Sequence, residues 1–401
     1  MGGTSLDICL IENKKPGYTT ESQIGGYPIR LPMIDIHTIG AGGGSIAWID
    51  AGKALRVGPK SAGAVPGPVC YGKGGTEPTV TDANVVLGRI NPNYILDGSF
   101  AINTEEARRV IESNIAKPLG LTVDEAAAGI IRVVNANMVR GIRVVSVEKG
   151  YDPREFSLVA FGGAGPAHAV ELARELNMRE VIIPINPGIT SALGMLTADV
   201  RHDYVQTYVK DTSVISSDEI NHLFKELEVQ AVRQLTAEGF CETDMCCLRS
   251  LDMRYYRQAY ELSVDLPGGK ITQETIIGAE KAFHEKHERL YGYRRQNDIV
   301  ELINVRVIAI GKLPKMDFSK AAVKKEQVIP RPSAYRKVFL DDRSHTTPIY
   351  QRSGLLYGNS ITGPAIIEQL DSTTLVFPGQ EAVIDQFGNI HIHLEGGVTY
   401  E

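Results

Sequence analysis

The sequence predicts a mixed α/β protein whose first half alternates strands with helices and whose last part is rich in strands. The composition is that of a folded protein, because 43% of the residues are apolar and 22% are charged. The runs 158–161 and 181–185 are short and apolar, as buried strands of a parallel sheet are, and a helix is predicted between them over about 166–176. After residue 336, segments of alternating polarity are separated by Gly and Pro, which is typical of β structure.

The other elements of the first half follow from apolar patterns and helix-start signals. Residues 6–11 are predicted as a strand, and 34–39 and 46–50 as strands on either side of a glycine turn. A long helix is predicted to begin after Thr122 and to run to about Val147, since acidic residues would stand in its first turn. Its apolar residues share one helical face: Ile130, Val133, Val134, Met138 and Ile142.

The pattern changes near residue 200, where we predict a domain boundary. Helices are predicted over about 217–238 and 272–291, and strands over about 250–265 and 299–311.

We therefore expect two domains, 1–200 and 201–401. The second is α+β to about residue 313, continues through a linker over 314–335 and ends in a β-rich part over 336–401, with the pattern of a small sandwich or barrel.

Charge and composition exclude several classes of partner. The chain has 42 basic and 48 acidic residues, a net charge of −6, and no block of five like charges, so neither nucleic acid nor an anionic membrane is an expected partner. No apolar stretch approaches the length of about 18 residues needed to span a membrane, and no signal peptide is recognised. Five irregularly spaced cysteines indicate a reducing, cytoplasmic compartment.

The first candidate site is the segment Gly2, Gly3, Thr4 and Ser5, which is followed by Asp7 at the start of a strand. Two glycines let backbone N–H groups point at an anion, two hydroxyls add donors, and a carboxylate two residues later can hold Mg²⁺ or orient a water. The alternative is a flexible segment with a chance pair of glycines.

The second candidate site lies in the run from Val159 to His168, a strand, a glycine turn and a helix start. Such a turn admits a nucleotide close to the backbone, and the helix N-terminus favours negative charge. The run is not the GxGxxG fingerprint of dinucleotide-binding proteins. The alternative is a tight packing turn between a strand and a helix.

Between these segments, Gly42, Gly43 and Gly44 and the run 58–84 form irregular backbone of a kind that is usually functional. Asp82 is the best placed carboxylate in the run 58–84. It is expected either to take part in a site or to cap a helix that starts near Ala83.

Cysteine and histidine are two further residue types that can carry chemistry. Cys70 is interpreted as a structural thiol rather than a nucleophile, because no partner histidine is evident. The histidines show no strong metal spacing; His391 and His393 share a strand face, where packing is favoured over ligation.

Several motifs, in order, resemble the hydantoinase A/5-oxoprolinase family, over nearly the whole chain. They are MGGTSLD, TIGAGGGSIAWID, GPKSAGAVPGPVCYGKGGTEPTVTDAN, FGGAGPAHA, PGITSALGMLTADVRHDY, LDMRYYRQAYELSV, HERLYGY and GPAIIEQLDSTTLVFPGQ. The chain differs from the family pattern at Arg257, where members more often have glycine.

The resemblance implies an actin-like ATPase fold, of which this chain would supply one ribonuclease-H-like half, and ATP-dependent opening of a cyclic amide of the hydantoin or 5-oxoproline type. Residues 2–5 would form the second phosphate loop and Asp7 would be a catalytic, Mg²⁺-binding or water-orienting carboxylate. The adenosine loop would be Gly162, Gly163, Ala164 and Gly165. Together with Gly42, Gly43 and Gly44 these are the candidate cofactor-binding residues, and Asp82 is the second candidate catalytic residue.

The resemblance also sets expectations about partners. Family members have a further N-terminal half, with a first phosphate loop and metal-binding residues that could hold Zn or Mn. We therefore expect an oligomeric, multisubunit enzyme that needs that half or a hydantoinase B-like subunit. The alternatives are a subunit of an ATP-dependent ketone carboxylase of the acetone or acetophenone type, and a non-catalytic assembly module.

Overall fold

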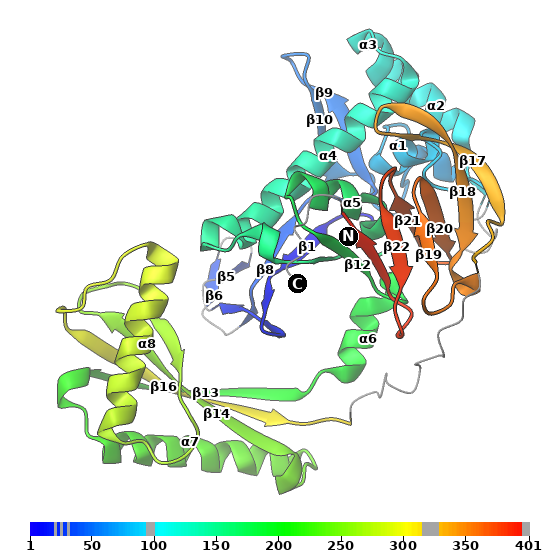
Figure 1. Cartoon of the computed structure of the whole chain (residues 1–401). Coiled ribbons are helices and arrows are strands. Elements are labelled where there is room, and N and C mark those ends of the chain that lie inside the picture. Colours follow the sequence, from blue (N-terminus) through cyan, green and yellow to red (C-terminus); the bar gives the residue numbers. More distant parts are fainter. Residues whose placement is uncertain (20–21, 25–26, 30–32, 94–100, 315–328, 395–401) are drawn as a thin grey trace. The chain divides into compact units, whose positions relative to one another are not determined.

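The computed structural model describes residues 1–19, 22–24, 27–29, 33–93, 101–314 and 329–394 (Figure 1). The contacts of the chain divide it into two compact units. Unit 1 combines Met1–Leu193 with Asp317–Glu401, and unit 2 is Gly194–Met316. Helix α6 (Thr190–Thr197) contains the point where the chain passes from the first unit to the second.

A five-stranded sheet joins the two sequence segments of unit 1. Its strand order is β11 (Leu158–Val159), β12 (Glu180–Ile183), β23 (Ile390–His393), β22 (Glu381–Ile384) and β19 (Ser360–Thr362). Strands β11 and β12 are parallel, as predicted, and helix α5 (Gly165–Glu175) connects them. Strand β23 runs antiparallel to β12, with Val181 opposite Ile392.

The pairing of β12 with β23 differs from the sequence expectation for the C-terminal part. That part was predicted to be a small separate sandwich or barrel within a domain over 201–401, but β19, β22 and β23 extend the sheet of β11 and β12. The physical reason is burial: Ile390 and Ile392 belong to the same apolar core as Val181 and Ile183.

A second sheet of unit 1 lies in the same C-terminal segment. Its order is β17 (Ala334–Leu340), β18 (Arg343–Gln351), β20 (Ala365–Gln369) and β21 (Ser372–Val376). Strands β18 and β20 are parallel, whereas the other two pairs are antiparallel. The predicted linker over 314–335 falls largely outside the described residues, and its last residues already belong to β17.

Helix α4 (Val123–Val145) is the longest helix of unit 1 and begins where the sequence predicts. Thr122 and Glu125 form a reciprocal capping box, in which the Thr122 amide donates to the Glu125 carboxylate at 2.8 Å. The predicted apolar face is buried, with Ile130 and Met138 fully enclosed in the core.

Two short hairpin-like pairs stand beside α4. β1 (Leu6–Cys9) pairs with β8 (Ile36–Ile39), and β9 (Ser45–Ile49) pairs with β10 (Leu55–Ser61). The two strands that flank the glycine turn, β8 and β9, therefore pair with other strands and not with each other. The remaining elements of unit 1 are β2 (Ile11–Glu12), β3 (Lys15–Pro16), β4 (Tyr18–Thr19), β5 (Ser22–Ile24), β6 (Tyr27–Ile29), β7 (Met33–Ile34), α1 (Val80–Val86), α2 (Thr104–Ile111), a π-helical turn (Glu112–Ala116) and α3 (Lys117–Leu119).

Unit 2 is an antiparallel sheet with two helices and has its own core. The strand order is β13 (Val200–Asp211), β16 (Val300–Gly311), β14 (Met245–Tyr255) and β15 (Leu262–Asp265), with helices α7 (Ser217–Ala237) and α8 (Gln273–Tyr291). Phe224 of α7 and Phe283 of α8 are fully buried in this core.

One strand predicted in unit 2 is two strands. The run 250–265 forms the pair β14–β15, which turns between Tyr255 and Leu262. Arg257 lies in that turn with φ +65°, a left-handed conformation that suits glycine. The turn accounts for the break, because this backbone cannot continue a strand.

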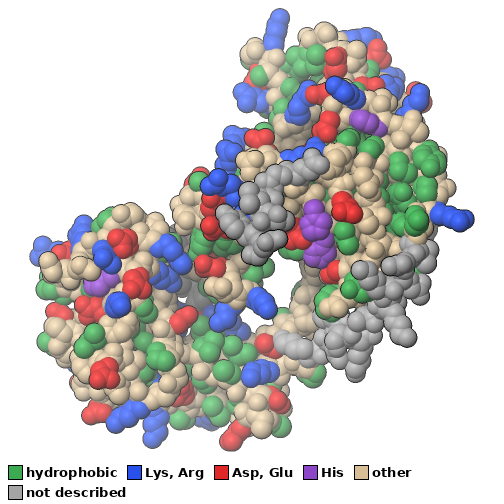
Figure 2. Space-filling view, in the orientation of Figure 1, with side chains coloured by type: hydrophobic (Ala, Val, Ile, Leu, Met, Phe, Trp, Pro, Cys, Tyr) green, Lys and Arg blue, Asp and Glu red, His purple; other side chains and the backbone are tan. Residues whose placement is uncertain are grey.

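Two further observations concern membrane-spanning helices and the distribution of charge. No helix among the described residues has the length and apolar character that crossing a bilayer requires. On the face drawn in Figure 2, basic and acidic side chains are interspersed, with no large area of one sign.

Candidate functional site

Three glycine segments that are far apart in the sequence meet in unit 1. The amides of Gly43 and Gly44 donate to the carbonyls of Gly2 and Gly3, at 2.9 and 2.6 Å. On the other side, the nitrogen of Met1 donates to the Phe161 carbonyl at 2.9 Å, and the Ala164 amide donates to the Met1 carbonyl at 3.2 Å. Figure 1 shows the N-terminus beside α5, in agreement with these bonds. Residues 1–5 therefore lie between the 42–44 and 161–165 segments.

The 2–5 turn is exposed at its two glycines and carries donors that have no partner in the described part of the chain. Gly2 and Gly3 are exposed, and a Cβ atom built on either would meet nothing within 4 Å. The Gly2 amide closes the turn on the Ser5 carbonyl at 3.2 Å. Among the described residues, no partner is present for the amides of Gly3 and Thr4 or for the hydroxyls of Thr4 and Ser5. Unpaired backbone amides in a turn can bind an anion.

The 42–44 segment supports this turn from inside. All three glycines are buried, and a Cβ on Gly42 would lie 2.6 Å from the Gly3 carbonyl carbon. A Cβ on Gly43 would lie 2.7 Å from the Thr81 hydroxyl. These residues were predicted to contact a cofactor, but their burial leaves no access to one. They are glycines because two backbones approach closely here.

In the 161–165 loop, Gly162 packs closely against residue 1, whereas Gly163 is exposed. Gly162 has φ +81°, and a Cβ on it would lie 2.3 Å from the Met1 carbonyl oxygen. Gly163 is exposed, and a Cβ there would meet only the Asp371 carbonyl oxygen, at 3.2 Å. Helix α5 begins at Gly165 with no side-chain cap on its N-terminus. Its first amides therefore favour negative charge beside the 2–5 turn.

Asp7 stands on β1 directly after the turn and is exposed. One of its carboxylate oxygens accepts a hydrogen bond from the Thr38 hydroxyl at 2.7 Å across the β1–β8 pair. No group of three or more His, Cys, Asp or Glu side chains in the described part of the chain could hold a metal alone. A lone exposed carboxylate could hold Mg²⁺ only together with other ligands, such as phosphate oxygens and water.

Asp82 takes the structural role that the sequence left open. It is fully buried and accepts from the amides of Val69, Cys70 and Thr79, at 3.2, 2.7 and 2.9 Å, and from the Thr79 hydroxyl at 2.7 Å. It is the third residue of α1 and completes a capping box with Thr79, rather than capping from the position before Ala83. With both oxygens hydrogen-bonded and the side chain buried, the contacts of Asp82 are those of a structural carboxylate.

Cys70 is a core thiol. It is fully buried, and this burial, with Asp82 nearby, raises the pKa of the thiol. A thiol that stays protonated is a poor nucleophile.

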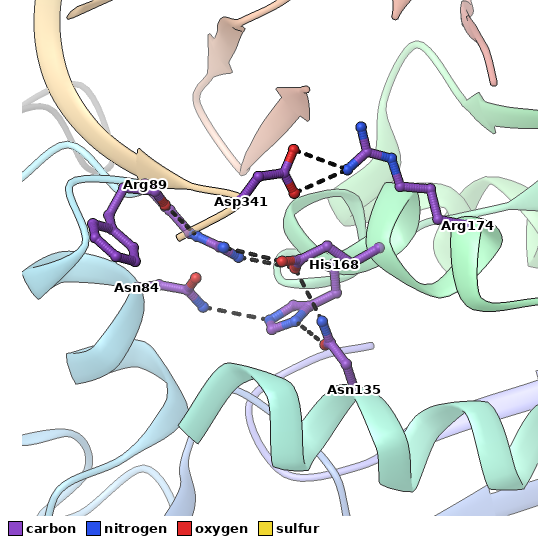
Figure 3. Close-up of polar contacts among 8 residues, drawn as sticks. Asn84, Arg89, Asn135, His168, Arg174 and Asp341 are labelled. Carbon is purple, nitrogen blue, oxygen red and sulfur yellow. Dashed lines mark hydrogen bonds and ion pairs between the residues drawn. The ribbon is translucent and has the colours of Figure 1, made fainter. Parts of the chain in front are cut away.

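A buried polar network, which the sequence analysis did not identify, follows the 161–165 loop (Figure 3). Arg89 makes two hydrogen bonds to the Glu171 carboxylate, at 2.9 and 3.0 Å. Asn135 of α4 donates to Glu171 at 3.0 Å and places its carbonyl oxygen 2.8 Å from Nδ1 of His168. Nε2 of His168 lies 3.4 Å from the amide nitrogen of Asn84 in α1. The network joins α1, α4 and α5.

The donors and acceptors of this network define one tautomer of His168. Because the Asn135 nitrogen is used for Glu171, its oxygen accepts from His168, and Nδ1 carries the proton. Nε2 is then the acceptor for Asn84. Burial lowers the pKa of His168 to about 4, so the ring is neutral at pH 7. Burial would raise the pKa of Glu171, but the charge and hydrogen bonds of Arg89 outweigh it and keep that pKa low.

The network fixes the start of α5, since His168 is in its first turn and 1% exposed. Sequence signals for it are weak. The partners of His168 are 33 and 84 residues away in the sequence, so only the histidine of the FGGAGPAHA run could have been singled out.

Comparison with known protein families gives matches over both parts of the chain. The profile described as hydantoinase/oxoprolinase matches residues 1–204, and that of the hydantoinase/oxoprolinase C-terminal domain matches residues 208–395.

Comparison with individual proteins gives three informative relatives. The chain is 38% identical to caprolactamase subunit alpha of Pseudomonas jessenii, over 96% of this chain and 56% of that protein. It is 35% identical to 5-oxoprolinase 1 of Arabidopsis thaliana, over 98% of this chain and 32% of that protein. It is 34% identical to the acetophenone carboxylase gamma subunit of Aromatoleum aromaticum, over 97% of this chain and 55% of that protein.

The crystal structure of ATP-dependent caprolactamase from Pseudomonas jessenii superimposes with a TM-score of 0.85 at 37% identity, covering 98% of this chain and 58% of that one. The chain thus spans little more than half the length of the caprolactamase subunit it resembles.

Proposed function

The chain belongs to the hydantoinase/oxoprolinase family, and we propose that it is the nucleotide-binding and C-terminal part of an ATP-dependent enzyme that opens a cyclic amide. The observation that carries this proposal is the 2–5 turn, whose exposed glycines and unpaired backbone and hydroxyl donors lie beside the uncapped N-terminus of α5. Two adjacent groups of donors are what a bound polyphosphate requires.

The proposed fold of the whole enzyme is an actin-like ATPase, in which two ribonuclease-H-like halves enclose the nucleotide and unit 1 contributes to one of them. The mixed α/β architecture and the contact between the 2–5 and 161–165 segments support this reading. The substrate would be a hydantoin, a 5-oxoproline or a related lactam, in line with the names of the amide-hydrolysing relatives.

In this proposal, Gly2, Gly3, Thr4 and Ser5 bind the phosphates and Asp7 holds Mg²⁺. Gly163, exposed at the start of α5, admits the nucleoside side of the ligand, while Gly162 keeps the loop against residue 1. ATP supplies the phosphoryl group that converts an unreactive amide carbonyl into one that water can attack. The buried Gly42–Gly44 segment holds the phosphate-binding turn in position.

Two alternatives differ from this proposal in the reaction. The 34% identity to an acetophenone carboxylase subunit favours a ketone carboxylase, in which the same nucleotide site would serve a ketone and bicarbonate. The second alternative is a non-catalytic assembly module, which would fold and hold a partner without turning over ATP. In every case we propose that catalysis requires further polypeptide, either the N-terminal half of the relatives or a hydantoinase B-like subunit, in an oligomeric assembly.

The binding proposal is tested by calorimetric titration of the chain, assembled with that further polypeptide, with Mg-ATP. Gly3→Val should fold normally, because its Cβ meets nothing within 4 Å, but should weaken ATP binding by about tenfold or more by filling the space of a phosphate. Gly268→Val is the matched control, since that glycine of unit 2 also has open space around it. Equal ATP affinity in both variants would contradict the assignment of the turn.

The reaction class is tested by measuring ATP hydrolysis by the assembled enzyme with panels of cyclic amides and of ketones plus bicarbonate. Turnover that depends on a cyclic amide supports the proposal. Turnover that depends on a ketone supports the carboxylase alternative. Failure of the assembled protein to bind ATP supports the non-catalytic alternative.

A further inference from the structure

A hollow of about 410 Å³ lies in unit 2, where the β14–β15 turn meets the segment after α8. Four tyrosines, two arginines and a glutamine line it, and no carboxylate is among these described lining residues. The lining therefore carries two formal positive charges and no negative charge. A volume of this size is in the range of small-molecule sites.

The floor of the hollow is fixed by hydrogen bonds. Tyr255 is 1% exposed, and its hydroxyl lies 2.7 Å from Nδ1 of His284 and accepts from the Arg295 amide at 2.9 Å. The side chain of Gln258 accepts from the Tyr255 amide at 3.3 Å and lies 3.0 Å from Nε2 of His287. The two loops that form the hollow are thus joined through a buried tyrosine.

The two arginines lie over tyrosine rings at the rim. The guanidinium of Arg257 is 5.2 Å from the ring centroid of Tyr256, and that of Arg295 is 5.5 Å from the ring centroid of Tyr293. Stacking on a ring orients a guanidinium and leaves its N–H edge for an oxyanion. Arg295 has an exposed ion pair with Asp298 at 3.3 Å, whereas Arg257 forms no ion pair in the described part of the chain.

The backbone of Arg257 is also unfavourable for its side chain. Its φ of +65° is a conformation that glycine adopts without strain and that arginine adopts at a cost. Strained residues of this kind cluster at binding and catalytic sites. In the described part of the chain, the stacking on Tyr256 is the one contact that the structure gives this exposed guanidinium, so its N–H groups are available to an anion.

We propose that this hollow binds a small molecule through a carboxylate or phosphate group, with Arg257 and Arg295 as the cationic contacts. The hydroxyls of Tyr256 and Tyr293, which have no hydrogen-bond partner among the described residues, supply further donors. The site is built from residues of unit 2 alone, whereas the ATP site proposed above is built from unit 1. This site is therefore additional to the proposed ATP site, and each of the two can be tested without the other.

The test is calorimetric titration of the full chain, without metal and at constant ionic strength, with citrate and separately with pyrophosphate. Arg257→Gly removes the cation and suits the left-handed backbone, so this variant should fold at least as well as the unchanged chain. Lys53→Gly is the matched control, because Lys53 is an exposed cation of unit 1 with φ +60°.

We expect at least one anion to bind, Arg257→Gly to weaken that binding by about tenfold or more, and Lys53→Gly to leave it unchanged. A response with citrate identifies a carboxylate ligand, and a response with pyrophosphate alone identifies a phosphate ligand. If neither anion binds, or if Arg257→Gly binds both as tightly as the unchanged chain does, the proposal is wrong.

Discussion

Asp7 is the residue on which the proposed chemistry most depends. It is exposed, next to the phosphate-binding turn, and its known partner is a neutral hydroxyl at 2.7 Å. Asp7→Asn keeps the shape and the contact with Thr38 but removes the charge that would hold Mg²⁺. We expect ATP turnover by the assembled enzyme to fall by about 100-fold or more with little change in unfolding temperature.

The control for Asp7→Asn is Asp342→Asn, which removes a similarly exposed carboxylate that is paired with Arg132. Steady-state ATP hydrolysis at several Mg²⁺ concentrations measures both variants. A fully active Asp7→Asn enzyme would show that this carboxylate neither binds the metal nor orients a water.

His168 should make unit 1 less stable in mild acid. Burial lowers the pKa of His168 from 6.5 to about 4, with Glu171 opposing and Arg89 reinforcing that shift. Between those pH values the unfolded chain binds the proton and the folded chain does not. The contribution of His168 to the free energy of unfolding is therefore fully present above pH 6.5 and declines as the pH falls towards 4. The difference corresponds to about 3 kcal/mol.

Urea unfolding of the chain and of His168→Gln between pH 4 and 7.5 measures this contribution. The variant should be less stable at pH 7, by about 1–3 kcal/mol, because the network loses hydrogen bonds. It should also lose less stability on acidification than the unchanged chain. Parallel curves for the two proteins would show that the imidazole is not held neutral.

At the residue scale, the sequence predicted the chemistry of some side chains and not others. Asp82 was expected either in a site or as the cap of a helix starting near Ala83, but it is the third residue of α1, and Thr79 is the N-cap. The capping box that these two residues form depends only on residues close together in the sequence. The contacts of His168 with Asn84 and Asn135 depend on the packing of three helices, and no local pattern encodes them.

The loop and helix at 161–175 show how one element serves packing and binding together. Gly162 faces the carbonyl of Met1 at a distance that excludes a Cβ, whereas Gly163 faces open space on most sides. Gly162→Ala should therefore lower the free energy of unfolding by about 1–3 kcal/mol, and Gly163→Ala should change it by less than about 1 kcal/mol. Thermal unfolding of both variants provides the measurement.

ATP affinity completes this comparison, because the two glycines have different proposed roles. Gly163→Val should weaken Mg-ATP binding by the assembled protein while keeping the fold. Unchanged affinity in Gly163→Val would remove the adenosine-loop assignment from this segment.

Element boundaries were largely predictable, but strand partners were not. Helix α4 begins after Thr122 as predicted, because the residues of its capping box and its apolar face lie in one continuous segment of the sequence. Pairing of β12 with β23 joins residues about 200 positions apart, and local periodicity carries no information on such partners. The strand predicted over 250–265 is broken at Arg257, which has a left-handed backbone. Glycine is the residue that usually marks such a position, and here it is replaced by arginine, so the residue itself gave no indication of a turn.

For the whole molecule, unit 2 has the features of an insertion between the two segments of unit 1. Its chain enters at β13 and leaves at β16, and Val200 lies opposite Gly311 in that antiparallel pair. The Leu313 amide also donates to the Asp199 carboxylate at 3.0 Å, so the entry and exit points are adjacent. A domain boundary was expected near residue 200, where glycine becomes scarce, whereas the contacts divide the chain after Leu193 and again after Met316.

This arrangement predicts that each unit folds without the other. Replacing residues 201–310 with a short Gly-Ser linker should leave unit 1 folded, because the joined ends already lie opposite each other as neighbours in a β ladder. Residues 194–316 alone should fold around their own buried core of Phe224 and Phe283. Calorimetric unfolding of the full chain should then show two transitions, each reproduced by one of the shortened proteins. A single transition in the full chain, with neither shortened protein folding alone, would mean that the two units depend on each other for stability and that the division by contacts does not reflect independent folding.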